Sequence, residues 1–252
     1  MEFDLSKIKF SKNDLKKGIN IPKNLDSRLA EFVGIIVGDG HIGFYENRNA
    51  RYPYTHYEVR ISGNLKDSDY YSNFINQLAY GLFNTKFSAR KPKKENSITL
   101  TKDSKAIYYF LKEYFEIPQR KDNVKIPKII LNATDEIKSS FLRGLADSDF
   151  CLTIKSSKNY PVIQGTSKSK NLMTQCSKIL NDLGIKNYIY CENSFYEKRK
   201  KLYTRYCINI NGFSRVREFL AIVGFSNKLK ISNYEKFLEK MAGQKGFEFE
   251  RS

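Results

Sequence analysis

Two aspartates, Asp39 and Asp149, occupy matching places in two similar apolar segments and are the residues of this chain best suited to chemistry. The apolar spacing of EFVGIIVGDG and SFLRGLADSD predicts helices over 27–38 and 135–148. Each aspartate would then lie at a helix C-terminus, where the helix dipole disfavours a carboxylate by roughly 0.3–1 kcal/mol. Two such ends brought together would need cations. Hard divalent ions, Mg²⁺ above all, suit a carboxylate pair that faces phosphate.

Small residues recur four apart in both predicted helices. Gly34 and Gly38 share one helix face, and so do Gly144 and Ser148. Because glycine inside a helix costs roughly 1 kcal/mol relative to alanine, this repetition predicts that the two backbones touch along these faces. The alternative, that the glycines only mark helix ends, accounts for Gly38 but not for Gly34 or Gly144.

A third acid, Asp147, lies two residues before Asp149, which is about 200° around a helix. It therefore cannot share the direction of Asp149, and its counterpart in the first segment is the apolar Val37. We interpret Asp147 as a surface or hinge carboxylate.

The similarity between the two segments extends over most of the chain. Residues 59–78 align without a gap with residues 161–180, which sets Gly63 on Gly165. Each copy is predicted to run as a helix ending at the aspartate, a hairpin, a helix, a second hairpin and a third helix. The predicted elements cover 27–38, 41–63, 66–82, 85–101 and 104–115 in the first copy, and 135–148, 150–166, 168–183, 186–211 and 213–223 in the second.

The elements predict an α+β fold of two αββαββα repeats related by a pseudo-twofold axis. We expect a first repeat over 1–115, with an N-terminal extension at 1–26, and a second over 135–252. The segment 116–134, rich in Lys, Pro and Asn, joins them, and a helix at about 228–241 closes the second repeat.

The composition indicates a globular protein with a polyanionic partner. The 252 residues carry 44 Lys and Arg against 27 Asp and Glu, a net charge of +17, and 40% are hydrophobic, which excludes a disordered chain. Basic residues alternate with aromatic and β-branched ones in 48–60, 86–94 and 186–205, so one strand face can seal a core while the other meets phosphates and bases. The alternative is a merely solvated lysine-rich sheet.

Several classes of protein and of site are not expected. No apolar run approaches the roughly 18 residues that cross a bilayer, and the first residues lack the order of a secretory signal, so we expect an internal protein. The four cysteines contain no C-x-x-C pair, and we expect reduced thiols rather than a zinc site.

The segments FVGIIVGDG (32–40) and FLRGLADSD (141–149) resemble the two signature helices of the LAGLIDADG homing endonucleases in their single-chain, two-repeat form. The resemblance extends from about residue 27 to residue 241. It implies a saddle of antiparallel sheets over a long double-stranded DNA site, with the signature helices at the interface between repeats. It also implies a monomer that makes a staggered double-strand cut across the minor groove, and that serves the homing of an intron or mobile gene.

The resemblance implies that Asp39 and Asp149 bind Mg²⁺, which Mn²⁺ or Ca²⁺ replaces in binding, and that each directs the cut of one strand. The backbone carbonyls of Gly38 and Ser148 are expected to add to the metal site. The second motif departs from the family by ending in Phe150, where glycine is common.

Further site residues follow from the same resemblance. A lysine near the active centre of each repeat matches Lys121 in IPQRKDNVKIP and Lys228 in FSNKLKIS, with ordinary basic loop residues as the equally open alternative. A polar residue that often ends the first hairpin is not evident, and neither Asn64 nor Gln164 is assigned to that place. Base and phosphate contacts are expected from basic residues of the hairpins. These are Arg48, Arg51, Arg60, Arg90, Lys155, Lys198 and Arg205.

Other functions on the same fold stay open. One is an RNA maturase acting on intron RNA, and another is a non-cleaving DNA-binding regulator, although retention of both aspartates favours the nuclease. An intein-borne endonuclease is disfavoured by Met1 and by the lack of a terminal His-Asn pair. We expect a prokaryotic cytoplasmic, nucleoid-associated protein, with the organellar matrix as the alternative.

Overall fold

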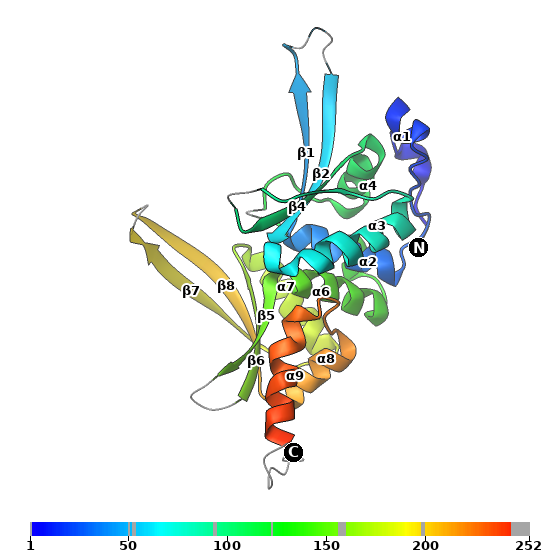
Figure 1. The fold of residues 1–252 in the computed structure, drawn as a ribbon. Helices are drawn as coiled ribbons and strands as arrows, with labels where there is room; N and C mark the ends of the chain where they lie inside the picture. Colours follow the sequence, from blue (N-terminus) through cyan, green and yellow to red (C-terminus); the bar gives the residue numbers. More distant parts are fainter. Residues whose placement is uncertain are drawn as a thin grey trace.

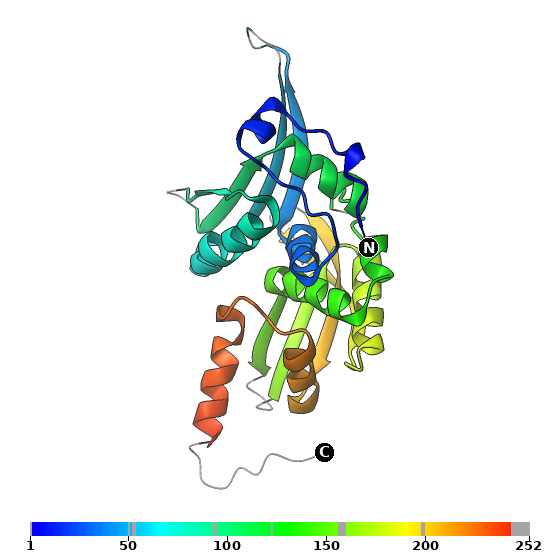
Figure 2. The same ribbon diagram turned by 90° about the vertical axis from the view of Figure 1, so that its right-hand side faces the viewer.

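The computed structural model describes residues 2–49, 51, 54–92, 95–121, 123–155, 160–197 and 200–242. Two four-stranded antiparallel sheets form one side of the molecule, and helices cover the opposite side (Figure 1). Seen from the helical side, two helices cross at the centre, one from each half (Figure 2). This arrangement confirms the predicted α+β fold of two similar repeats.

The first half alternates helices and hairpins in the predicted order. Its elements are α2 (Ser27–Gly38), β1 (Gly40–Asn47), β2 (Tyr54–Asn64), α3 (Asn76–Phe83), β3 (Ser88–Arg90), β4 (Ser97–Asp103) and α4 (Lys105–Phe115). The strands lie in the order β1-β2-β4-β3. The helix predicted at 66–82 is not regular, because a 3₁₀ turn at Leu65–Asp67 and a π-helical turn at Tyr70–Ile75 precede α3.

The second half repeats this plan with a longer second hairpin. Its elements are α6 (Asp135–Asp149), β5 (Phe150–Lys155), β6 (Tyr160–Ser167), α7 (Lys170–Asp182), β7 (Tyr188–Tyr196), β8 (Lys201–Asn211), α8 (Phe213–Ile222) and the closing α9 (Leu229–Ala242). The order β5-β6-β8-β7 matches that of the first sheet.

The parts outside the repeated elements carry short helices that were not predicted. The N-terminal extension holds a 3₁₀ turn at Leu5–Lys7 and α1 (Lys12–Lys16), and the joint holds α5 (Lys128–Leu131). All strands of one sheet precede the segment 116–134 and all strands of the other follow it, while the exact domain boundaries stay a prediction. Among the described residues, none of the helices has the length and apolar character that a bilayer crossing requires.

The strand ladders correct the predicted alignment of the two glycines. Gly40 pairs with Ile61 in the first sheet, and Phe150 pairs with Gly165 in the second. Because Gly40 and Phe150 each follow an aspartate, Gly165 corresponds to Ile61 and not to Gly63. The predicted alignment was therefore wrong by two residues. The glycine of the second repeat makes room for a side chain of its own repeat.

That side chain is Phe150, the departure from the family motif. A Cβ on Gly165 would lie 2.3 Å from the Phe150 ring, so glycine there leaves the space that the ring fills. The ring also stacks on Phe219 of α8, with centroids 6.4 Å apart. Phe150 is therefore a core residue, and the strand that follows Asp149 keeps its course.

Helices α2 and α6 touch through their backbones. A Cβ on Gly34 would lie 2.1 Å from the carbonyl oxygen of Phe141, and one on Gly144 would lie 2.0 Å from that of Glu31. A Cβ on Gly38 would lie 2.4 Å from the Cβ of Ser148. Such separations are too short for real atoms, so the glycine stripes make the contact possible. The predicted close approach is confirmed.

We predict that Gly144→Ala lowers the free energy of unfolding, because the added methyl group forces α2 and α6 apart. The loss should be about 1–3 kcal/mol or more, as for other overpacked cores. Gly81→Ala is the matched control, since a Cβ on this α3 glycine would meet only the Arg28 guanidinium at 3.9 Å. It should be neutral or stabilising by up to about 1 kcal/mol. Urea denaturation measures both, and equal stability of the two variants would contradict the backbone contact.

Candidate active site

The contact between α2 and α6 brings their two C-terminal aspartates to one place. Asp39 follows the last turn of α2, and Asp149 ends α6. A Cβ on Gly38 would lie 3.5 Å from Oδ2 of Asp149, so the carboxylate from the second repeat lies against the end of the first helix. The two predicted metal ligands are thus neighbours at the dyad between the repeats.

Burial and mutual repulsion make these carboxylates poor acids. Burial, together with the charge of Asp39, raises the pKa of Asp149 to about 7 against the opposing effect of Lys121 and Lys230. Burial also raises the pKa of Asp39, while the hydroxyl of Tyr71 and the ammonium groups of Lys121 and Lys230 act in the opposite direction. Two like charges in this setting are stable only with positive charge beside them.

Two lysines supply part of that charge. Lys121 donates from Nζ to the carbonyl of Gly38, and its pKa is lowered by burial although Asp149 and Asp39 favour its charged form. Lys230, at the start of α9, donates from Nζ to the carbonyl of Phe150 at 2.7 Å. The structure therefore brings the predicted Lys121 to the aspartates.

The structure brings Lys230 to the aspartates rather than the predicted Lys228, whose role stays a prediction. The side chain of Lys228 is exposed, whereas Lys230 is half-buried and acts on both aspartates. The reason is that α9 begins at Leu229, so Lys230 in its first turn faces inward while Lys228 still belongs to the preceding loop. The motif FSNKLKIS contains both lysines, and nothing in its letters distinguishes the second from the first.

The oxygen donors at the dyad fit a hard divalent cation. Two adjacent carboxylates with raised pKa values offer anionic oxygens whose repulsion a cation relieves. No cluster of three or more His, Cys, Asp or Glu occurs among the described residues, so further ligands must come from carbonyls, water or phosphate. The Gly38 carbonyl accepts from Lys121, and the role of the Ser148 carbonyl stays a prediction.

A pocket of about 850 Å³ connects the dyad with the second sheet. Asp149, Gly38 and Lys121 line one part of it, and residues of β6, β7 and β8, including Phe195 and Arg205, line another. Asp149 is therefore reached from the sheet side of the molecule, where the strands of both halves lie (Figure 1).

The predicted DNA contacts lie on these strands and their turns. Arg205 on β8 pairs with Glu192 at 2.8 Å, Arg60 on β2 lies 3.5 Å from Glu58, and the exposed Arg48 pairs with an acid of β1. Three of the other predicted DNA contacts have exposed side chains, namely Arg51, Arg90 and Lys155. The remaining one, Lys198, lies outside the described residues.

The two polar candidates at the first hairpins are engaged elsewhere. Asn64 accepts a hydrogen bond from the backbone N–H of Lys66 at 2.9 Å, and Gln164 donates to the hydroxyl of Tyr190 at 2.6 Å. The residue that the ladder sets beside an aspartate is instead Ser62, whose N–H donates to the carbonyl of Asp39 at 3.1 Å.

Asp147 is not the surface carboxylate that the sequence suggested. It is 2% exposed and accepts from the Tyr70 hydroxyl at 3.0 Å, from Ser226 N–H at 3.2 Å and from Asn227 N–H at 3.0 Å. It does point away from Asp149, as the helical geometry requires. The interpretation failed because the loop after α8, about 80 residues later in the chain, covers this face of α6.

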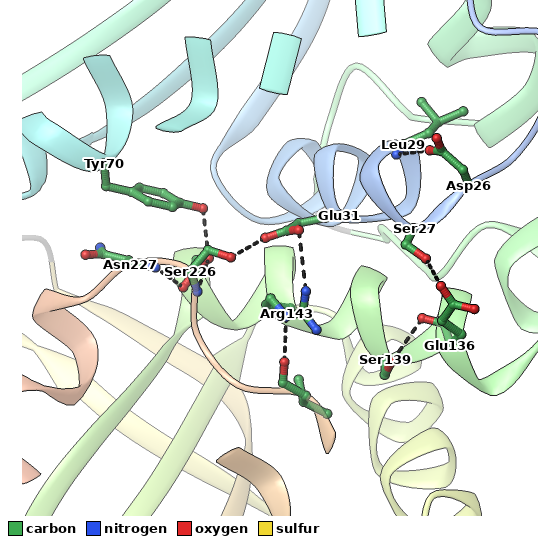
Figure 3. A network of polar contacts seen from close by, with 12 residues as sticks. Asp26, Ser27, Leu29, Glu31, Tyr70, Glu136, Ser139, Arg143, Ser226 and Asn227 are labelled. Carbon is green, nitrogen blue, oxygen red and sulfur yellow. Dashed lines mark hydrogen bonds and ion pairs between the residues drawn. The ribbon is translucent and has the colours of Figure 1, made fainter. Parts of the chain in front are cut away.

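A network of polar side chains extends from this loop across the helix pair (Figure 3). Ser226 Oγ donates to Glu31 of α2 at 2.5 Å, Glu31 lies 3.7 Å from the guanidinium of Arg143 on α6, and Arg143 donates to the carbonyl of Val223 at 2.7 Å. Asn227 reaches the first repeat through Asp67 at 2.9 Å. The loop that positions Lys230 is thus held by both repeats.

Tyr71 is a second neighbour of the aspartates that sequence reasoning missed. Its hydroxyl donates to Oδ2 of Asp39 at 2.6 Å, and the residue is 3% exposed. The only hint of its role in the sequence is that two large aromatic residues, Tyr70 and Tyr71, are adjacent in the predicted helix. In a regular amphipathic helix, one of two adjacent residues should face solvent.

Comparison with known proteins agrees with this geometry. A family model described as a LAGLIDADG-like domain matches residues 136–224, which include α6 and its aspartate. The homing endonuclease I-DmoI in complex with DNA and Ca superposes with a TM-score of 0.57 at 19% identity, over 85% of this chain and 100% of that chain. The same enzyme with DNA and Mn gives 0.54 at 21%, over 80% and 98%. The chain therefore has the fold of these enzymes, and its second repeat matches the LAGLIDADG-like domain.

Two curated relatives of this chain carry unrelated names. A probable translation initiation factor IF-2 from Methanocaldococcus jannaschii is 28% identical over 94% of this chain and 19% of its own length. A DNA polymerase from Thermococcus sp. strain GE8 is 26% identical over 66% of this chain and 9% of its own length. The chain therefore spans about a fifth or less of these relatives.

The raised pKa of Asp149 makes the aspartate pair a pH-dependent source of instability when no cation is bound. A carboxyl whose pKa rises from 3.8 to about 7 on folding stabilises the fold fully below pH 3.8, and this contribution is lost as the pH rises through 7. With a chelator present, we predict that the stability of Asp149→Asn relative to the wild type rises between pH 5 and pH 8 by the order of a few kcal/mol.

Thermal or urea unfolding at the two pH values measures this difference. Asp135→Asn is the control, because Asp135 lies in the exposed first turn of the same helix and its effect should be small at both pH values. Asp147→Asn should destabilise instead, since an amide cannot accept all three hydrogen bonds of that carboxylate. Burial also raises the pKa of Asp147 to about 7, so part of the wild-type pH dependence should remain in Asp149→Asn. A wild-type pH dependence that Asp149→Asn does not reduce at all would refute the assignment.

Proposed function

We propose that this protein is a site-specific DNA endonuclease that makes a staggered double-strand cut across the minor groove by divalent-metal-dependent phosphodiester hydrolysis, with Mg²⁺ as its physiological ion. The observation that carries the proposal is the pair Asp39 and Asp149, one from each repeat, held side by side at the dyad with Lys121 beside them. A pseudo-twofold pair of acids suits a duplex, whose two scissile phosphates are related by a similar dyad.

The roles of the residues follow from their charges. Asp39 and Asp149 would hold the metal, which when bound activates water for attack on phosphorus and neutralises the leaving oxygen. Lys121 and Lys230 stabilise the extra negative charge that develops on the phosphate in the transition state. Because both aspartates come from one chain, a monomer contains the complete centre.

DNA binding is proposed for the strands of the two sheets. The net charge of +17 supports a polyanionic partner, and Phe195, Tyr203 and Arg205 line the pocket that leads from β7 and β8 to Asp149. The I-DmoI structures, solved with DNA and with Ca or Mn, support both the partner and the class of metal. We assign base and phosphate contacts to the predicted basic residues of the hairpins.

A homing role is supported by the relatives. The same module matches 19% of an initiation factor and 9% of a DNA polymerase, two proteins with no common task. A module that recurs within unrelated proteins behaves as a mobile insertion, and an enzyme that cuts DNA at one long site suits the spread of such an element. We therefore propose that the cut serves homing, in the compartment that holds the target genome.

The test is cleavage of a plasmid library with and without Mg²⁺, followed by sequencing of the cut ends. We expect metal-dependent double-strand cuts at one long site, and Asp39→Asn should lower the rate by the order of 10²–10³-fold while DNA binding in Ca²⁺ persists. An RNA maturase or a regulator would keep its activity in Asp39→Asn. Absence of any metal-dependent cut over a range of salt concentrations would exclude the nuclease.

The lysine assignment gives a separate prediction. Lys230→Met should slow cleavage by about 10–100-fold, because it removes positive charge beside both aspartates. Lys228→Met is the matched control, an exposed lysine two residues earlier, and should change the rate less than about threefold. Single-turnover kinetics at saturating enzyme measure both, and a larger loss from Lys228→Met would return the role to the residue first predicted.

A further inference from the structure

The two aspartates at the dyad do not have the same surroundings. The carboxylate of Asp39 accepts a hydrogen bond of 2.6 Å from the Tyr71 hydroxyl. Within the described residues, no hydrogen bond is made to the carboxylate of Asp149, which is influenced only through burial and the charges of Asp39, Lys121 and Lys230. One carboxylate is therefore oriented by a direct donor, and the other is not.

The place of Tyr71 is created by the fold of the first repeat. A Cβ on Gly63 of β2 would lie 1.9 Å from the Tyr71 hydroxyl, so only glycine leaves room for the ring under the sheet. The π-helical turn at Tyr70–Ile75 lets two adjacent tyrosines face inward at once, with Tyr70 donating to Asp147 at 3.0 Å. Turns of this kind are enriched at functional sites.

The second repeat is built differently beside its aspartate. Phe150 occupies the space over Gly165, and α7 is a regular helix that presents apolar residues, Leu172, Met173 and Cys176, to the core. Burial, and to a smaller extent the charge of Asp149, raises the pKa of the Cys176 thiol, so this apolar face of α7 lies near the carboxylate. The asymmetry is thus built into both repeats.

We propose that Tyr71 is a positioning residue for Asp39, and that it makes the two cleavage centres unequal so that the strand served by Asp39 is cut first. This inference rests on the proposed nuclease function. The physical reason is pre-organisation, because a carboxylate already held by a neutral donor loses less freedom when it takes up its working geometry. The Asp149 carboxylate must be ordered during the reaction.

The experiment follows the two strands separately. A cognate duplex carries a different dye on each strand, and single-turnover cleavage in Mg²⁺ gives one rate for each. Asp39→Asn and Asp149→Asn identify the strand that each aspartate serves, as the strand whose rate falls more. In the wild type we expect nicked duplex to accumulate with the Asp39 strand cut.

Tyr71→Phe removes the hydroxyl and keeps the ring. It should slow the Asp39 strand by about 10–100-fold and raise the Mg²⁺ concentration that this strand requires, while the Asp149 strand changes less than about twofold. Tyr70→Phe is the matched control, since it removes an adjacent phenol that donates to Asp147, and it should leave the ratio of the two rates unchanged. Gly63→Ala, which displaces the Tyr71 ring, should act like Tyr71→Phe.

The outcomes separate the inference from the function beneath it. If Tyr71→Phe slows both strands equally, Tyr71 is only a structural residue and the inference fails, while the nuclease stands. The inference alone also fails if the wild type cuts the Asp149 strand first or cuts both strands at one rate. If the wild type cuts no duplex in any divalent metal, the proposed function fails and the inference fails with it.

Discussion

The contact between the backbones of α2 and α6 at Gly34 and Gly144 is the constraint on which the molecule depends. Each helix leads into the four-stranded sheet of its own repeat and has an aspartate at its C-terminal end. A side chain at either glycine would separate the helices, and the same displacement would open the angle between the sheets and part the two carboxylates. One packing detail thus sets both the shape of the binding surface and the geometry of the candidate metal site.

This contact places two acids where electrostatics opposes them. Both lie at helix C-termini, both are removed from water, and the pKa of Asp149 rises to about 7 as a result. Lys121 and Lys230 offset part of the cost, and a bound divalent cation would offset more. Without such a cation the aspartate pair is a local source of instability, and binding of a cation would relieve it.

Most of the fold and the central pair of the site could be predicted from sequence, because both rest on local patterns written twice. Apolar periodicity and glycine spacing located α2 and α6, and alternation located the hairpins. The residues that were missed or misread depend on contacts distant in sequence. Asp147 is buried by a loop about 80 residues away, and the choice of Lys230 over Lys228 depends on where α9 begins. Tyr71 required a π-helical turn that no propensity indicates.

The pseudo-twofold symmetry belongs to the backbone and stops at the side chains. Val37 stands where the second repeat has Asp147, and Lys121 donates to the carbonyl before its aspartate whereas Lys230 donates to the carbonyl after the other. A homodimer could not maintain such differences, because each change would appear in both halves. In a single chain the two halves can differ, so Asp39 accepts a hydrogen bond from Tyr71 while Asp149 lies near the apolar face of α7. Unequal halves also suit a DNA site whose two halves differ in sequence, since each sheet is then selected against its own half-site.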